Sequence, residues 1–92
     1  MVNAIVLINA ERNRIPETVA ALAEMPGVAE VYSVAGPYDI VAIIRVKENE
    51  RLAELVTNKM LKLSGIERTN TLIAFEAFSK FDLERMFSIG ME

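Results

Sequence analysis

The sequence predicts an α+β fold of the ferredoxin-like type, with its elements in the order β-α-β-β-α-β. Short β-branched runs alternate with two segments of helical periodicity, and each half of the chain reads as strand, helix, strand. Ninety-two residues also fit one compact domain. We therefore expect a four-stranded antiparallel sheet that carries both helices on one face.

The first half of the chain supplies three strands and one helix. Residues 2–9 are short and β-branched, which predicts a strand. Pro16 suits a first helical position and Pro26-Gly27 stops the segment, so a helix is expected over residues 16–25. Residues 28–35 and 40–47 predict the second and third strands, joined by a hairpin turn at residues 36–39.

The second half supplies a helix and a last strand. A helix is expected over residues 49–63 because five apolar residues follow one helix face: Leu52, Leu55, Val56, Met60 and Leu63. Leu61 points about 180° away from Leu52 and should be exposed. Residues 66–79 predict the last strand, and residues 80–87 a short amphipathic turn or helix. Residues 1–79 are thus expected to form the domain, with residues 80–92 as its C-terminal extension.

The third strand is apolar on both faces, which a half-solvated antiparallel sheet does not require. Ile40, Ala42, Ile44 and Val46 fill one face, and Val41 and Ile43 fill the other. The first strand repeats this pattern. Two helices cover only one face, so the sheet of a second copy is the simplest cover for the other, and we expect a homodimer. The alternative is that curled strand ends and the tail cover this face.

Composition excludes several classes of function. A net charge of −3 and a pI near 5.0 leave no basic surplus for phosphates, so direct nucleic-acid binding is not expected. Cysteine and histidine are both absent, which removes disulfides, thiolate ligands and the commonest general base. We expect no metal and no cofactor. The amino terminus lacks the features of a signal peptide or a membrane span, so a cytoplasmic protein is expected.

The stretch Gly36-Pro37-Tyr38-Asp39 has two interpretations. As a plain turn, glycine permits positive φ, proline fixes φ, and aspartate caps its own backbone. As a binding site, exposed backbone N–H groups could hold a carboxylate while Asp39 accepts bonds from an ammonium group. Such a combination of donors and an acid suits an α-amino acid.

The stretch Glu67-Arg68-Thr69-Asn70-Thr71 begins the last strand. Thr69 and Thr71 lie on one face, with Arg68 and Asn70 on the other. Threonine is common in strands, so a purely structural role remains open. The functional alternative is that the two hydroxyl groups bind a small polar ligand.

Two motifs with this element order resemble the ligand-sensing (RAM) domain of the Lrp/AsnC transcription regulators. They are PGVAEVYSVAGPYD and GIERTNT, and the likeness covers roughly residues 2–78. The resemblance implies face-to-face sheet dimers of the dimeric α/β barrel type, which often assemble into octamers with effector amino acids bound between dimers. It also implies that ligand contacts gather at Gly36, Tyr38, Asp39, Thr69 and Thr71.

The chain departs from the family's regulators because it begins at the first sensing strand, without the helix-turn-helix that binds DNA. It therefore resembles stand-alone sensing domains. We expect a non-enzymatic amino-acid sensor that docks with full-length regulators. The alternatives are a structural partner without a ligand, or a small dimeric monooxygenase or isomerase. An RNA-binding module is disfavoured because the central strands carry no aromatic residues.

Overall fold

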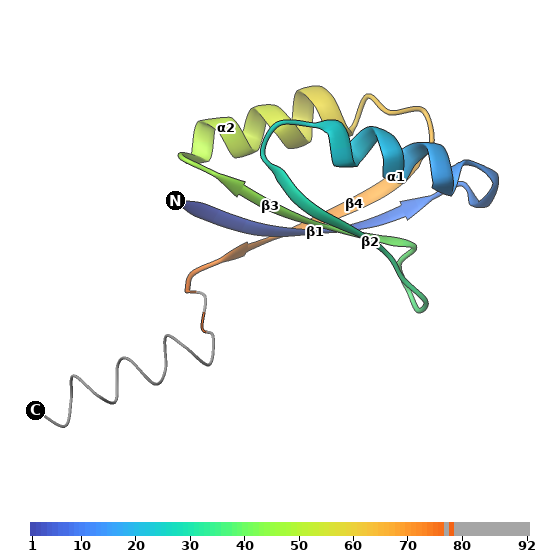
Figure 1. Ribbon diagram of the computed structural model, residues 1–92, viewed down its shortest axis with the longest axis horizontal. Helices are drawn as coiled ribbons and strands as arrows, with labels where there is room; N and C mark the ends of the chain where they lie inside the picture. Colours follow the sequence, from blue (N-terminus) through green and yellow to red (C-terminus); the bar gives the residue numbers. More distant parts are fainter. Residues whose placement is uncertain (77, 79–92) are drawn as a thin grey trace, which may run out of the picture.

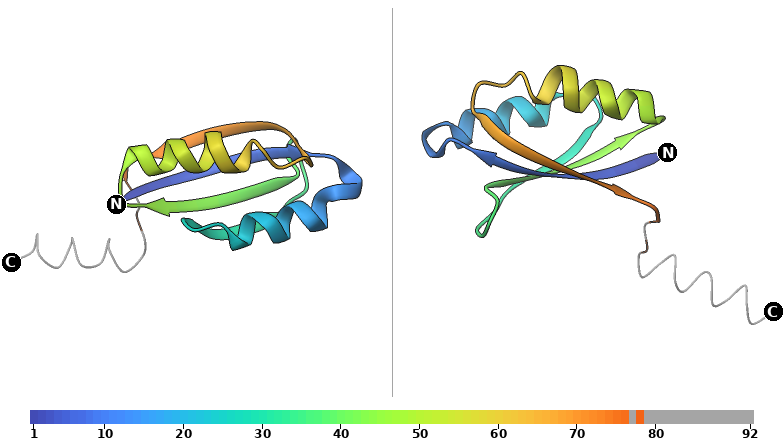
Figure 2. Two further views of the ribbon diagram at one scale, coloured as in Figure 1. Left: turned by 90° about the horizontal axis from the view of Figure 1, so that it is seen from above. Right: turned by 180° about the vertical axis from the view of Figure 1, so that it is seen from behind.

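The computed structural model describes residues 1–76 and 78, which form a four-stranded antiparallel sheet (Figure 1). β1 (Val2–Ala10) and β3 (Ile40–Val46) are central, with β2 (Val28–Ser33) and β4 (Ile66–Ala74) at the edges in the order β2-β3-β1-β4. The helical segments are η1 (Arg12–Arg14), α1 (Ile15–Glu24), α2 (Asn49–Glu54) and η2 (Leu55–Met60). α2 continues directly into η2. α1 and this continuous α2–η2 segment lie on one face of the sheet, which confirms the ferredoxin-like fold (Figure 2).

The core lies between the sheet and the helices. Alternate residues of β1 and β3 are buried there, and the register aligns Val6 with Ala42 and Ile8 with Ile40. The helices contribute Leu22, Leu52, Leu55 and Met60 to this layer. Each large apolar side chain that is fully buried stabilises the fold by about 1.5–3 kcal/mol. The alternation of buried residues along β1 and β3 therefore determines which face of the sheet packs against the helices.

The other face of the sheet is not covered by any described helix (Figure 1). We call it the open sheet face, and its large side chains are Ile5, Leu7, Tyr32, Val41, Ile43 and Leu72. The register places Ile5 beside Ile43 and Leu7 beside Val41. All four are partly exposed, which confirms that both central strands are apolar on both faces.

Tyr32 borders the open sheet face from β2, where it lies opposite Val41. Its hydroxyl group donates a hydrogen bond to the Glu30 carboxylate. This hydrogen bond and the negative charge of Glu30 raise the pKa of Tyr32 above its ordinary value of 10.0. The phenol therefore stays protonated at neutral pH and acts as a donor.

Several strand boundaries differ from the sequence-based expectation. β2 ends at Ser33 rather than at residue 35, so the connection to β3 is a six-residue loop, Val34–Asp39. β4 ends at Ala74 rather than at residue 79, and Phe75 is fully exposed. The expected extension over residues 80–92, with its turn or helix at 80–87, lies outside the described residues.

The segment over which one helix is expected, residues 49–63, contains two kinds of helix. The α-helix covers only Asn49–Glu54, and Leu55–Met60 forms a π-helix that closes with a hydrogen bond from the Leu61 N–H to the Val56 oxygen (3.1 Å). Residues five apart in an α-helix lie roughly 140° apart, and the wider π turn reduces that angle. Leu55 and Met60 can therefore both be buried, while Leu61 is half-exposed as expected.

Within residues 1–76 and 78, no helix combines the length and apolar content needed to cross a bilayer.

Two glycines with positive φ offer a matched test of local packing. Gly27 has φ of 97°, and an added Cβ would lie 2.8 Å from a Val46 methyl carbon; Gly36 has φ of 134° and open space around that position. We expect Gly36→Ala to lower the free energy of unfolding by about 1–3 kcal/mol through backbone strain alone. Gly27→Ala should lower the free energy of unfolding by about 1–3 kcal/mol more than Gly36→Ala, because the new Cβ also crowds the Val46 side chain. Urea unfolding of both variants measures the difference, and equal losses would contradict it.

Candidate functional site

The loop between β2 and β3 is held against the end of β1. The Val34 N–H donates a hydrogen bond to the backbone carbonyl oxygen of Asp39 (2.9 Å) and closes the loop. Gly36 supplies the positive φ inside the loop. The Asn9 side-chain amide on β1 donates to the Pro37 oxygen (2.9 Å). The loop conformation is therefore supported by a polar side chain from another strand as well as by its own backbone.

Asp39 joins the loop to an irregularity in the sheet. The β1–β4 register shifts between Asn9 and Ala10, and the Asp39 Oδ2 atom accepts a hydrogen bond from the Ala10 N–H there (2.9 Å). The Asp39 N–H also donates to the Ile8 oxygen (2.9 Å). The aspartate thus caps the backbone of β1 and not its own turn. Its second carboxylate oxygen accepts no hydrogen bond from the described residues.

An open cavity of about 330 Å³ lies at this end of the sheet. We call it the hairpin-end cavity, and its lining residues are Asn9, Pro37, Asp39, Glu67 and Arg68. Asn9 and Arg68 lie directly opposite each other in the β1–β4 register. The lining combines one guanidinium group, two carboxylates and one amide, so both signs of charge meet in a small space. A ligand that carries a carboxylate and an ammonium group matches this set.

The two predicted threonines face the other side of the sheet. The register pairs Thr69 with Ile8 and Thr71 with Val6, and both of those partners are fully buried under the helices. Thr71 lines a separate, mostly apolar cavity of about 370 Å³ between α2, η2 and β4. Within one protomer the structure therefore does not bring Thr69 and Thr71 together with Asp39.

Gly36 and Tyr38 belong to the same loop as Asp39 but do not line the hairpin-end cavity. The Tyr38 hydroxyl lies 3.4 Å from the Asn70 side-chain amide, on the side of the sheet opposite the threonines. The five predicted residues thus form two groups. One group is Gly36, Tyr38 and Asp39 at the loop, and the other is Thr69 and Thr71 under the helices.

Sequence reasoning did not select Asn9, Glu67 and Arg68 as site residues. The alternation of side chains could have identified Arg68, because it faces away from Thr69 just as Asp39 faces away from the buried Ile40. Asn9 carries no such signal, since only the pairing of β1 with β4 places it beside Arg68. In the part of the chain that the structure describes, no three acidic side chains come close enough to hold a metal ion.

Comparison with known proteins identifies one family. The model of the Lrp/AsnC ligand binding domain matches residues 3–82, most of the chain. The HTH-type transcriptional regulator FL11 of Pyrococcus horikoshii is 32% identical over 73 residues, which are 79% of this chain and 48% of the regulator. A second HTH-type regulator, PYRAB04820 of Pyrococcus abyssi, is 35% identical over 82 residues, or 88% of this chain and 55% of the regulator. The chain spans about half of the length of these two curated relatives.

Solved structures show the same fold. The crystal structure of TTHA0845 from Thermus thermophilus has 51% identity and a TM-score of 0.82, covering 87% of this chain and 100% of that one. Escherichia coli AsnC has 25% identity and a TM-score of 0.77, covering 83% and 52%. A feast or famine regulatory protein of M. tuberculosis, solved in complex with L-methionine, has 25% identity and a TM-score of 0.73, covering 87% and 54%.

The Asp39 hydrogen bond to β1 can be tested by its effect on stability. Asp39→Ala should lower the free energy of unfolding by about 1–3 kcal/mol, because the partly buried Ala10 N–H loses its acceptor. Asp39→Asn keeps a side-chain oxygen at this place and should lose clearly less. Chemical denaturation of the two variants beside the unmodified protein measures both values. An alanine variant as stable as the unmodified protein would show that the Asp39–Ala10 bond contributes nothing.

Proposed function

Because this chain belongs to the Lrp/AsnC ligand-binding domain family, we propose that it is a non-enzymatic sensor that binds a small amino acid at the hairpin-end cavity. The observation that carries the proposal is the meeting of Arg68 with Asp39 and Glu67 around this cavity. The M. tuberculosis relative, which was solved with L-methionine, supports an amino acid as the ligand. The naming of the curated relatives as transcriptional regulators supports a regulatory role without catalysis.

The charges of the cavity suggest how the ligand would be held. The planar guanidinium group of Arg68 can donate two parallel hydrogen bonds to the α-carboxylate. The ammonium group would then lie toward Asp39 and Glu67, where the second oxygen of Asp39 is available as an acceptor. A ligand of this size, held by a few charge-assisted hydrogen bonds, should bind with a Kd in the millimolar to micromolar range.

The predicted threonines enter the proposal through a neighbouring protomer. Thr71 lines a cavity at the α2–β4 surface, on the side of the sheet opposite the Tyr38–Asn70 contact. We propose that the ligand is enclosed between two dimers: Asp39 contacts it in the cavity of one dimer, Gly36 and Tyr38 shape the loop beside it, and Thr69 and Thr71 of the next dimer complete the enclosure. Such a ligand shifts the assembly equilibrium only if it favours one assembly state.

The open sheet face supports the proposed homodimer. Its aliphatic side chains are partly exposed and continuous across both central strands, and Tyr32 and Leu72 extend the surface to the two edges. Packing against the same face of a second copy would bury this surface. We propose that dimers assemble further, up to an octamer, in the cytoplasm, and that the module acts on full-length Lrp/AsnC regulators rather than on nucleic acid.

Amino-acid binding should depend on Arg68. In a thermal-shift panel of the twenty amino acids, we expect at least one to raise the Tm of the unmodified protein, and isothermal titration calorimetry then gives its Kd. Arg68→Gln should weaken that binding about tenfold or more, because a bidentate charge-assisted contact is lost. Arg12→Gln removes the same charge from an exposed residue outside the cavity and serves as the matched control.

Two outcomes would count against this site. If no amino acid stabilises the protein, the sensor proposal fails. If Arg68→Gln and Arg12→Gln bind the amino acid equally well, the ligand lies elsewhere.

The proposed dimer should depend on the open sheet face. Leu7→Lys places a charge in the middle of this face and should convert the dimer to a monomer, as measured by light scattering during size-exclusion chromatography. Leu61→Lys is the matched control, because Leu61 is half-exposed on the helix side. A monomeric unmodified protein, or a dimer that survives in Leu7→Lys, would refute this interface.

A further inference from the structure

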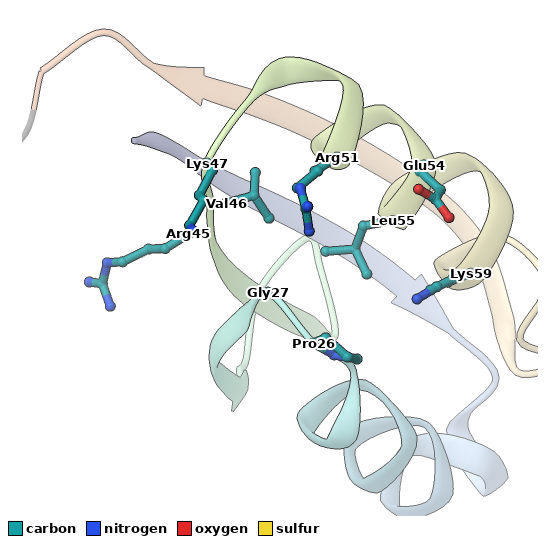
Figure 3. Close-up of a pocket in the computed structure, with 9 residues that line it drawn as sticks. All are labelled: Pro26, Gly27, Arg45, Val46, Lys47, Arg51, Glu54, Leu55 and Lys59. Atoms are coloured by element: carbon teal, nitrogen blue, oxygen red, sulfur yellow. The ribbon is translucent and has the colours of Figure 1, made fainter.

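A second cavity, of about 250 Å³, lies at the other end of the sheet from the hairpin-end cavity (Figure 3). We call it the basic pocket. It is framed by the Pro26–Gly27 turn, by the end of β3 with Lys47, and by α2 and η2, which contribute the exposed residues Arg51 and Lys59 and the buried Leu55. It shares no lining residue with the hairpin-end cavity.

Cationic residues are concentrated around this pocket. Four of the ten lysines and arginines in the chain line it, although the chain as a whole has a net charge of −3. Glu54 is the one acidic residue in the lining. Figure 3 shows Arg51 and Lys59 directed toward the Pro26–Gly27 turn, whereas Arg45 points away. The positive charge of the pocket therefore comes from Arg51 and Lys59, with Lys47 at the rim.

The π-helix aligns these two cations. Arg51, Leu55 and Lys59 are spaced four residues apart, and the last of them lies within Leu55–Met60. Over eight residues an α-helix would rotate the third side chain by roughly 80° from the first. The π turn winds through a smaller angle per residue, so it returns Lys59 toward the line of Arg51 and Leu55. The π-helix that allows Met60 to be buried thus also places Arg51 and Lys59 over the basic pocket.

The cations have little compensation from carboxylates. Among the described residues, the only ion pair of the pocket is Arg51 with Glu48, at 3.7 Å, and both side chains are mostly exposed. Pairs of this kind contribute about 0–1 kcal/mol. No described carboxylate lies within ion-pair distance of Lys47 or Lys59. An incoming anion would therefore not have to displace a strong internal partner.

The Pro26–Gly27 turn adds a backbone contribution. Gly27 adopts φ of 97°, and an added Cβ would lie 2.8 Å from a Val46 methyl carbon and 3.4 Å from a Leu55 methyl carbon, so a side chain here would require both neighbours to shift. Its oxygen accepts a hydrogen bond from the Arg45 N–H (2.9 Å), while its own N–H donates to no acceptor in the described part of the chain. A fixed glycine with an unused N–H, beside two cations, is typical of places where a backbone approaches an oxyanion.

We propose that the basic pocket is a binding site for a small oxyanion, either a phosphate group or a carboxylate group of a dianionic metabolite. Arg51 and Lys59 hold the anion from the helix, and the Gly27 N–H contacts it from the turn. The pocket is too small for a large ligand and lacks the paired carboxylates that an ammonium group needs. It is thus a site for a different class of ligand from the amino acid of the hairpin-end cavity, and its existence does not depend on that proposal.

The test is calorimetric titration of the full chain with inorganic phosphate and, separately, with succinate, at constant ionic strength with chloride as the balancing anion. We expect saturable binding of at least one of them, with a Kd in the millimolar range. The double variant Arg51→Gln, Lys59→Gln should weaken it about tenfold or more, with each single variant intermediate. The double variant Arg12→Gln, Lys62→Gln removes the same charge outside the pocket and should change the Kd by less than about twofold.

The two titrations and the control variant distinguish specific binding in the basic pocket from a general effect of net charge. A preference for phosphate or for succinate identifies the oxyanion and supports the site. Absence of saturable binding of both anions overturns the proposal, and so does an equal loss in the two double variants, because binding would then follow net charge alone. Circular dichroism of each variant verifies that it is folded, and the amino-acid panel on the same samples shows whether the hairpin-end cavity is affected.

Discussion

The pairing of β1 with β3 on one side and β4 on the other is the constraint on which the rest of the structure depends. Because this strand pairs along its whole length, its alternation sends Val6 and Ile8 under the helices and Ile5 and Leu7 to the open sheet face. A shift of one residue would exchange the two sets. The helix layer, the apolar open sheet face and the positions of the site residues therefore all follow from one register.

The same strand also creates the hairpin-end cavity. At Asn9 and Ala10 the register with β4 shifts, and the Ala10 N–H donates a hydrogen bond to the Asp39 carboxylate. This contact ties the β2–β3 loop to the end of β1, which pairs with the start of β4, so residues from three separate parts of the chain surround one space. Asp39 therefore has a structural role and a proposed ligand role at once, one for each of its oxygen atoms. The two interpretations of this loop, as a structural turn and as part of a binding site, are thus compatible.

The two ends of the sheet differ in their chemistry. The hairpin-end cavity combines an arginine with two acids and suits a zwitterion, whereas the basic pocket places Arg51 and Lys59 over a glycine turn and suits an anion. Their separation means that two ligands need not compete for space. A ligand at either site would shift an assembly equilibrium only if it bound one assembly state more tightly than the other.

The sequence by itself determined the element order, the ferredoxin-like fold, the two apolar faces of the central strands and the exposed position of Leu61. These properties depend on local periodicity, which the order of residues encodes directly. Only the tertiary structure decided that β4 ends at Ala74, that residues 55–60 form a π-helix, and that Asn9, Glu67 and Arg68 join Asp39 while Thr69 and Thr71 face the helices. Alternation shows only that Arg68 and Thr69 face opposite sides; which side chains meet at the cavity depends on pairing between strands distant in the chain. The π-helix depends on how the core accommodates Leu55 and Met60 together, and no local pattern signals it.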